Sequence, residues 1–156
     1  MENGLAVLQQ RGEKMRDIKF RMWHKQIKQM YNVGMINFEQ RFIFIKHSLN
    51  YTQSSFAMEE VELMQFTGLH DKNGKEIYEG DVVRKLVWNE LKFEAEGDGK
   101  DYSYAKVQYI DELASFHLVN KDNKILWELS EDKYNIEVAG NIYENSDLLK
   151  GADNIE

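Results

Sequence analysis

Apolar and polar residues alternate along residues 18–23, the first patterned stretch of the chain. Ile18, Phe20 and Met22 alternate with Lys19 and Arg21, and Trp23 ends the run. A period of two indicates a β-strand with one apolar face. Residues 24–29 are mostly polar and of ordinary hairpin length, and residues 30–36 return as an apolar partner strand. We therefore predict a β-hairpin here; the alternative is a helix over 19–31, because Lys, Gln and Met favour helices.

The clearest pattern covers residues 63–83. Thr67-Gly68 bends the chain towards Asp71-Lys72-Asn73-Gly74, in which the Asp side chain can bond its own backbone and Asn-Gly tolerates positive φ. Ile77-Tyr78 resumes the strand, Glu79-Gly80-Asp81 interrupts it, and apolar residues continue through 82–88. Glycine inside a strand marks a bulge or a sharp bend. The stretch predicts a tight hairpin that leads into the first long strand of a small barrel.

Further strands are predicted on both sides of this hairpin. They are residues 42–46, with Phe42, Phe44 and Lys46 on one face and Ile43 and Ile45 on the other, then 104–110, 116–118, 125–129 and 136–144. Residues 120–124 form the turn of a second hairpin. Ser55 can cap a short helix over 56–61, and Asn145 or Ser146 can cap a turn through Leu148-Leu149. Residues 89–102 are acidic and glycine-bearing, which is typical of an exposed loop.

The predicted fold is mainly β, or α+β if the short helices are counted. It is an SH3-like or related small barrel built from residues 61–149, preceded by an N-terminal β-hairpin and a variable segment in 15–60. The length of 156 residues suits one domain, over 15–150. Residues 1–14 lack periodicity and precede a second natural start at Met15, so we expect a disordered tail or an upstream extension. The tail 151–156 is expected to fray.

Composition narrows the class of protein. The chain has no cysteine, which excludes disulfides, thiolate zinc sites and a thiol nucleophile and fits a reducing cytoplasm. No apolar run approaches the roughly 20 residues that cross a membrane, and no signal peptide is recognisable. We therefore expect a cytoplasmic protein without membrane association.

Charge is distributed unevenly. The net charge is −7; residues 1–60 carry 9 basic and 6 acidic residues, and residues 61–156 carry 11 and 21. An acidic C-terminal half disfavours a broad phosphate-binding surface, because nucleic-acid affinity comes largely from basic residues that displace counterions. Nucleic acid is therefore a possible partner but not the favoured one.

No motif for catalysis or metal binding emerges. Glu79 and Asp81 are a candidate carboxylate pair, but no third ligand or partner base lies near them in sequence, so a backbone bend is the preferred interpretation. The acidic residues in 94–101 do not have EF-hand spacing. The four histidines, His24, His47, His70 and His117, are scattered without metal-ligand spacing, and His24 and His70 fall at predicted turns, where surface residues are expected. We predict no catalytic, cofactor-binding or metal-binding residue, and no enzymatic activity.

Aromatic residues offer one further lead. Trp23, Trp88 and Trp127 lie in predicted strands, where we expect core positions; an exposed cluster that binds a peptide, a base or a sister subunit is the alternative. The apolar run Phe42–Ile45 is either a buried strand or an oligomer contact. The segments at Ile77-Tyr78-Glu79 and Ile142-Tyr143-Glu144 echo each other, so their tyrosines are expected at equivalent edges, with packed rings and hydroxyls in water.

Four ordered segments carry a resemblance. They are Arg16-Asp-Ile-Lys-Phe-Arg-Met-Trp23, Leu63-Met-Gln-Phe-Thr-Gly-Leu69, Asp71-Lys-Asn-Gly-Lys-Glu-Ile-Tyr-Glu-Gly-Asp81 and Val138-Ala-Gly-Asn-Ile-Tyr-Glu-Asn145. Together they resemble the YopX family of phage and prophage proteins, from Met15 to about Leu149. His24 stands where the family typically has an acidic residue, and Ala139 where an Ile is common. The match is weakest over 37–60 and 89–104.

The resemblance implies a small cytoplasmic protein of a bacterial virus or prophage that self-associates and has no established activity. It supplies no catalytic residue and no cofactor. We therefore expect an accessory protein that acts by binding and self-assembly, through apolar strand surface such as Phe42–Ile45, with itself and a phage or host protein as partners. The alternatives are a nucleic-acid-associated regulator, which small barrels can support, and an enzyme of unknown type.

Overall fold

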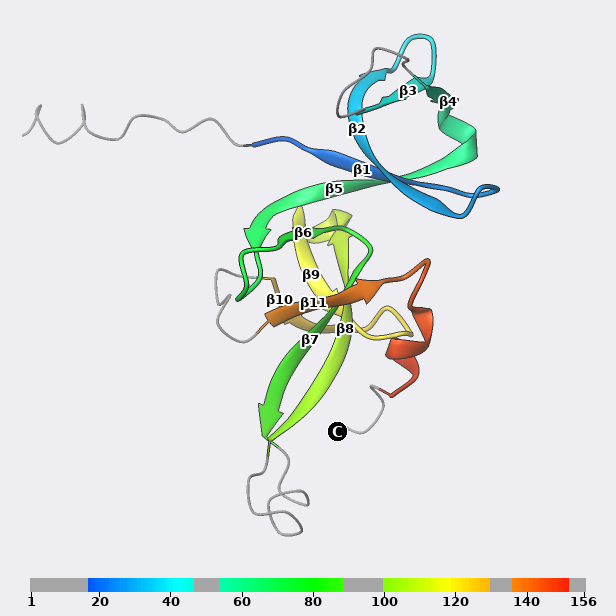
Figure 1. Ribbon diagram of the computed structural model, residues 1–156. Coiled ribbons are helices and arrows are strands. Elements are labelled where there is room, and N and C mark those ends of the chain that lie inside the picture. The colour runs from blue at the N-terminus through cyan, green and yellow to red at the C-terminus, as the bar shows by residue number, and fades with distance from the viewer. Residues whose placement is uncertain (1–16, 47–53, 89–99, 130–135, 152–156) are drawn as a thin grey trace, which may run out of the picture.

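Two antiparallel β-sheets make up the protein, as the computed structural model shows (Figure 1). It describes residues 17–46, 54–88, 100–129 and 136–151. The first sheet has six strands in the order β4-β3-β2-β1-β5-β6, and the second has five in the order β10-β9-β8-β7-β11. The prediction of a mainly β protein is confirmed. No helix in these parts of the chain is long and apolar enough to span a membrane.

The first sheet begins with the predicted hairpin. Its strands are β1 (Phe20–His24), β2 (Gln29–Asn37), β3 (Phe42–Ile45), β4 (Ser55–Ala57), β5 (Val61–His70) and β6 (Glu76–Tyr78). The helix considered over 19–31 does not form, because β1 is extended between β2 and β5 and buries successive residues on opposite faces. The helix expected over 56–61 is reduced to the 3-10 turn η1 (Met58–Glu60). Ser55 and Phe56 instead pair with β3, which gives their backbone groups partners in the sheet.

The second sheet is formed by β7 (Asp81–Trp88), β8 (Lys100–Ile110), β9 (Ser115–Val119), β10 (Ile125–Glu128) and β11 (Ile136–Asn141). The 3-10 turn η2 (Asp111–Leu113) joins β8 to β9, and η4 (Ser146–Gly151) lies against β8 and β7. The barrel expected over 61–149 is not closed, since β10 and β11 are the edges of an open sheet. The expected boundary at residue 61 also differs from the arrangement of strands, because β5 pairs with β1 in the first sheet.

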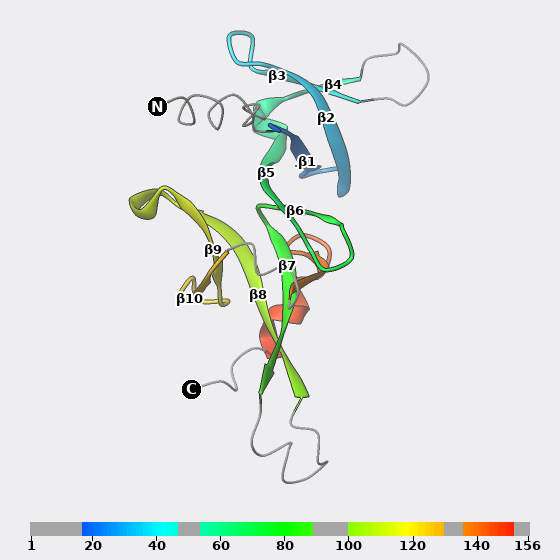
Figure 2. The same ribbon diagram turned by 90° about the vertical axis from the view of Figure 1, so that its left-hand side faces the viewer.

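Both sheets have the same connectivity. Four consecutive strands form a meander, and the fifth returns to pair with the first: β5 pairs with β1, and β11 pairs with β7. Figure 2 shows the chain passing from the first sheet to the second through β5, β6 and β7. This return brings residues far apart in sequence into register, with Arg21 opposite Met64 and Val83 opposite Val138.

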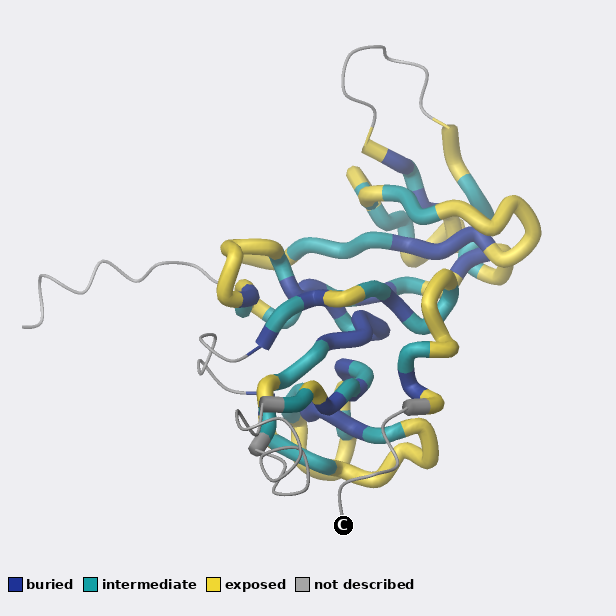
Figure 3. The backbone as a smooth tube through the Cα atoms, turned by 60° about the horizontal axis from the view of Figure 1, so that its bottom comes forward, coloured by how far each residue is buried: buried dark blue, intermediate teal, exposed yellow. Residues whose placement is uncertain are grey.

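Buried apolar side chains form three clusters. Figure 3 shows buried positions along the strands and exposed positions at many of the turns. One cluster lies within the first sheet and includes Met22 and Ile43, and one is built mainly from the second sheet and includes Val83, Leu118 and also Ile77 of β6. The third contains Trp23, Met64, Phe66 and Tyr78, with Tyr143 packed against it from beyond β11. Because β1 contributes to two clusters, both of its faces are buried. The sheets are joined by the second cluster through Ile77 and by the third through Tyr143.

Two hairpin turns share one hydrogen-bond pattern, as their sequences predicted. The Gly74 N–H donates to the Asp71 carbonyl at 2.9 Å, and the Asn123 N–H donates to the Asn120 carbonyl at 3.1 Å. Gly74 and Asn123 both have positive φ, 81° and 61°. The predicted turn residues therefore occupy the positions where left-handed backbone is required.

Replacing Gly74 with alanine should lower the free energy of unfolding by about 1–2 kcal/mol. A Cβ at this position meets no atom within 4 Å, so the cost is that of the backbone conformation alone. Gly74→Asn should cost less, because Asn already adopts this conformation at position 123. Urea unfolding of the two variants measures the difference, and equal losses would show that the backbone conformation is not the cause.

Candidate functional site at the junction of the two sheets

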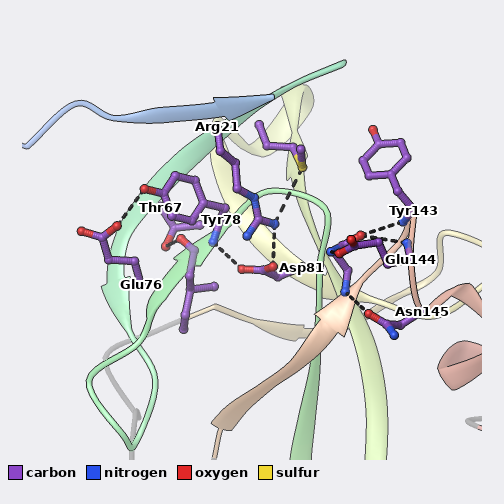
Figure 4. Close-up of polar contacts among 11 residues, drawn as sticks. Arg21, Thr67, Glu76, Tyr78, Asp81, Tyr143, Glu144 and Asn145 are labelled. Atoms are coloured by element: carbon purple, nitrogen blue, oxygen red, sulfur yellow. Dashed lines mark hydrogen bonds and ion pairs between the residues drawn. The ribbon is translucent and has the colours of Figure 1, made fainter. Parts of the chain in front are cut away.

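Buried polar contacts join β1 to the start of β7 (Figure 4). Arg21 and Trp23 project from the same face of β1, because alternate residues of a strand share a face. Nη2 of Arg21 donates to Oδ1 of Asp81 at 2.5 Å. The two side chains are 12% and 1% exposed, so this ion pair is largely removed from water. Removing either side chain would therefore leave the other charge buried without a counter-charge.

Asp81 also closes the turn between β6 and β7. Its Oδ2 accepts the Tyr78 N–H at 2.8 Å, and Gly80, with φ of 77°, allows the chain to bend between them. Burial raises the pKa of Asp81 above its ordinary value, and the Arg21 guanidinium opposes that rise. Residues Glu79-Gly80-Asp81 thus form a turn between the sheets, which agrees with the backbone bend that we preferred over a carboxylate pair. Glu79 has a different partner, the Tyr109 N–H at 3.3 Å, so the two carboxylates do not act on one group.

The two echoing tyrosines both pack against β1. The Arg21 guanidinium lies 4.7 Å from the Tyr78 ring centroid, and Tyr143 stacks on Trp23 at 5.4 Å. The Tyr78 hydroxyl donates to Glu76 at 2.7 Å instead of facing water, and burial together with this hydrogen bond raises its pKa to about 12. The echoing segments also touch, since the Ile142 N–H donates to the Gly80 carbonyl at 2.9 Å. The segments around Tyr78 and Tyr143 thus lie next to each other, where β1 meets the second sheet.

Asp71 forms a second link between the sheets. Its Oδ1 accepts the N–H groups of Asn73 and Lys75 at 2.8 and 2.9 Å, and its Oδ2 accepts the Val138 N–H of β11 at 3.0 Å. Burial alone would raise the pKa of this carboxyl, but the three backbone hydrogen bonds outweigh it and hold the pKa below its ordinary value. Turn chemistry in the sequence predicted the two local bonds, whereas no sequence signal indicated the bond to Val138.

An open cleft of about 500 Å³ lies beside the junction. It is lined by Gln65, Glu79, Tyr109, Asp111, Ala114, Ser115 and Phe116. Tyr109 and Phe116 form an edge-to-face pair with ring centroids 5.2 Å apart. Among the described residues, no basic side chain forms an ion pair with Glu79 or Asp111. Sequence reasoning missed this cleft, because β5, the β6–β7 turn and the β8–β9 connection each supply only part of it.

Ser115 and His117 form a hydroxyl–imidazole pair near the cleft. Ser115 Oγ lies 2.9 Å from His117 Nε2 and donates to the Leu113 carbonyl at 3.2 Å. His117 Nδ1 is buried and has no hydrogen-bond partner in the described part of the chain. No third group among the described residues therefore orients the imidazole, as activation of a nucleophile by a histidine usually requires. The absence of enzymatic activity stays a prediction.

The other histidines have different environments. His24 is buried, and its Nδ1 accepts the N–H groups of Gln26 and Ile27 at 3.3 and 3.2 Å, so the expectation of a surface residue is wrong. Its side chain closes the β1–β2 turn while its ring packs against Phe56. His70 is exposed, as predicted, and His47 lies outside the described residues. Within the described ranges, no group of three or more His, Asp or Glu side chains is placed to hold a metal.

The tryptophans occupy core positions where their side chains are described. Trp23 is 5% exposed in the third cluster, and Trp127 packs half-buried against the core of the second sheet. These two side chains therefore do not form the exposed cluster considered as an alternative. Trp88 ends β7, and its side chain lies outside what is described, as do the segment 89–99 and residues 1–14.

Two basic residues of β7 stack on aromatic rings. Arg84 lies 4.7 Å from the Tyr102 ring centroid, and Lys85 lies 4.9 Å from that of Trp127. Arg84 also contacts Glu137 at 2.8 Å, and Lys72 contacts the same carboxylate. Glu137 thus offsets part of the positive charge of Arg84 and Lys72, while Lys85, the next residue along β7, points to the opposite face of the sheet.

The β2–β3 hairpin exposes apolar side chains. Met35, Phe38 and Phe42 are 48%, 72% and 42% exposed, whereas Ile43 and Ile45 are buried. The alternation predicted for Phe42–Ile45 is thus present, with one face of β3 in the core and the other facing outwards. We call Met35, Phe38 and Phe42 the hairpin patch.

Comparison with known proteins finds one matching family model and a similar solved structure. The family model described as YopX protein matches residues 19–150. Among solved structures, the chain is similar to protein EF1440 from Enterococcus faecalis, known from a crystal structure, with 26% sequence identity and a TM-score of 0.57. That similarity covers 85% of this chain and 98% of the other. No curated protein matches the chain.

Proposed function

This chain belongs to the YopX protein family, and on that premise we propose that it is a phage or prophage accessory protein that works by binding and self-assembly in the bacterial cytoplasm. Family membership supports the phage or prophage origin. The strand order of the second sheet, in which β11 returns to pair with β7, supports an SH3-like description of that part of the chain. The contact proposed for self-assembly is the hairpin patch, which is the observation that carries the proposal.

The hairpin patch has the character of an interface. Three large apolar side chains are exposed within eight consecutive positions, 35–42, and contiguous exposed apolar surface marks interaction sites. Residues 35–46 carry Arg41 and Lys46 against a single acidic residue, Glu39, although the whole chain has a net charge of −7. Because each copy is acidic overall, the electrostatic repulsion between two copies is smallest when they meet through this slightly basic hairpin.

A second copy fits this surface better than an unrelated partner of opposite charge. Homodimer interfaces are more apolar than other interfaces, and a two-fold axis brings the same patch from each copy together. β4 is a three-residue edge strand beside β3, and no described strand pairs with its other side. Its backbone groups can therefore pair with the same edge of the second copy.

Phe42→Asp should abolish self-association or weaken it by at least about tenfold. The substitution removes an aromatic side chain that the proposed interface would bury, and it introduces a charge there. Ile125→Asp is the matched control, since Phe42 and Ile125 are both 42% exposed and the second residue lies on β10. Sedimentation velocity over a range of concentrations measures the effect. A wild-type protein that sediments only as a monomer, or equal weakening by both substitutions, would overturn the proposal.

A further inference from the structure

The walls of the cleft beside the junction come from three separated segments that hydrogen bonds tie together. The Glu79 N–H donates to the Gln65 carbonyl at 2.9 Å, which ties the β6–β7 turn to β5. The Tyr109 N–H donates to Oε1 of Glu79 at 3.3 Å, which ties the same turn to the end of β8. Asp111, Ser115 and Phe116 complete the wall from the β8–β9 connection. Figures 1 and 2 show this connection at the end of the second sheet that faces β5 and β6.

The polar groups of the cleft suit a cation. Oε2 of Glu79 and both carboxylate oxygens of Asp111 have no hydrogen-bond partner among the described residues. The ring pair of Tyr109 and Phe116 lines the same space, and aromatic faces attract cations. Carboxylates beside aromatic rings match a guanidinium, which is planar, stacks on rings and forms paired hydrogen bonds with one carboxylate. The described residues offer no three-ligand group here, so a metal ion is the poorer match.

We propose that this cleft binds an arginine side chain presented by a partner protein. The cleft is open to solvent and of about 500 Å³, which lies within the range of ligand sites and leaves space for the main chain next to the arginine. Its acidic lining complements a basic partner, and the net charge of −7 favours the approach of such a partner. The site is distinct from the hairpin patch, which lies on β2 and β3, so either proposal can fail without the other.

A titration with short blocked peptides tests the site. The probe is a peptide of glycine and serine residues with a single central arginine, and the comparison peptides replace that arginine with lysine or with neutral citrulline. Two-dimensional amide NMR at low ionic strength should show saturable shifts at Gln65, Glu79 and Tyr109 with the arginine peptide, weaker shifts with lysine and none with citrulline. Equal binding of the citrulline peptide, or shifts confined to other surfaces, would overturn the proposal.

Charge-matched variants separate the cleft from general attraction to an acidic protein. Glu79→Gln combined with Asp111→Asn should weaken the arginine peptide at least about tenfold, because both charge-assisted contacts are lost. Asp122→Asn combined with Glu128→Gln changes the net charge equally at exposed positions of the β9–β10 hairpin and should leave binding unchanged. Equal weakening by both pairs would show that no specific site exists. The spectra of the free variants report whether each remains folded.

Discussion

Replacing Arg21 with methionine is expected to lower the free energy of unfolding by about 3–5 kcal/mol, the range for breaking a buried ion pair from one side. Asp81, 1% exposed, would lose its ion-pair partner and keep the Tyr78 N–H as the one hydrogen-bond donor to its side chain among the described residues. Methionine preserves an unbranched apolar stem against the Tyr78 ring, so the loss reports mainly on the charge. Urea unfolding followed by tryptophan fluorescence measures it, because Trp23 lies in the adjoining cluster.

A second substitution tests whether the buried charge is the cause. Arg21→Met combined with Asp81→Asn should recover part of the lost stability, since the uncompensated carboxylate is then gone. The pKa of Asp81 is already raised by burial, and removing the guanidinium that opposes this should raise it further. The single variant's deficit should therefore be largest above that raised pKa and shrink as pH falls through it, because protonation neutralises Asp81. A deficit that is unchanged at low pH, or no recovery in the double variant, would contradict this explanation.

Asp71→Ala is expected to destabilise the fold by about 3 kcal/mol, because it leaves three backbone N–H groups without their charged acceptor. Asn120→Ala is the matched control. Its Oδ1 accepts the N–H groups of Asp122 and Lys124, the same two local bonds, but none of its bonds reaches another sheet. It should cost about 1 kcal/mol, as loss of a side-chain cap does. Hydrogen exchange at the Val138 amide should quicken in the Asp71 variant only.

The pH dependence of stability provides an independent check on Asp71. Its folded-state pKa lies below the ordinary value of about 3.9, so its contribution is complete above that value and is lost as pH falls through the folded pKa. Wild type should therefore lose more stability than Asp71→Ala on acidification below about pH 4. Parallel acid profiles for the two proteins would show that this carboxylate does not stabilise the fold in its ionised form.

Turns and strands whose determining residues lie close together in the sequence could be predicted from it. The turns at Asp71–Gly74 and at 120–124 were read correctly because the side chain that bonds the backbone and the residue with positive φ lie within one short segment. Most strands were also read correctly from their period of two. The same reasoning failed over 56–61, where helix-capping residues were present but pairing with β3 provided partners for the backbone of Ser55 and Phe56.

The candidate site could not be predicted in the same way. Arg21 and Asp81 are 60 positions apart, and their contact depends on β1 lying over the turn before β7. The cleft is lined from Gln65 to Phe116 by segments that no spacing rule connects. His24 was misread for a related reason: a polar side chain at a turn was expected in water, but its ring is covered by Phe56.

Most strand positions, the turn types, the family and the alternating faces of β3 follow from the order of residues alone, because they depend on local backbone geometry and on short motifs. The partners of β1 do not. Its sequence shows alternating faces, yet both are buried, one by the first sheet and the other by the junction with the second. Which sheet β5 joins, whether the barrel closes, and which carboxylates meet Arg21 or remain unpaired in the cleft depend on how the two sheets pack. Such packing is set by long-range contacts, whose energy is shared among residues that are distant along the chain.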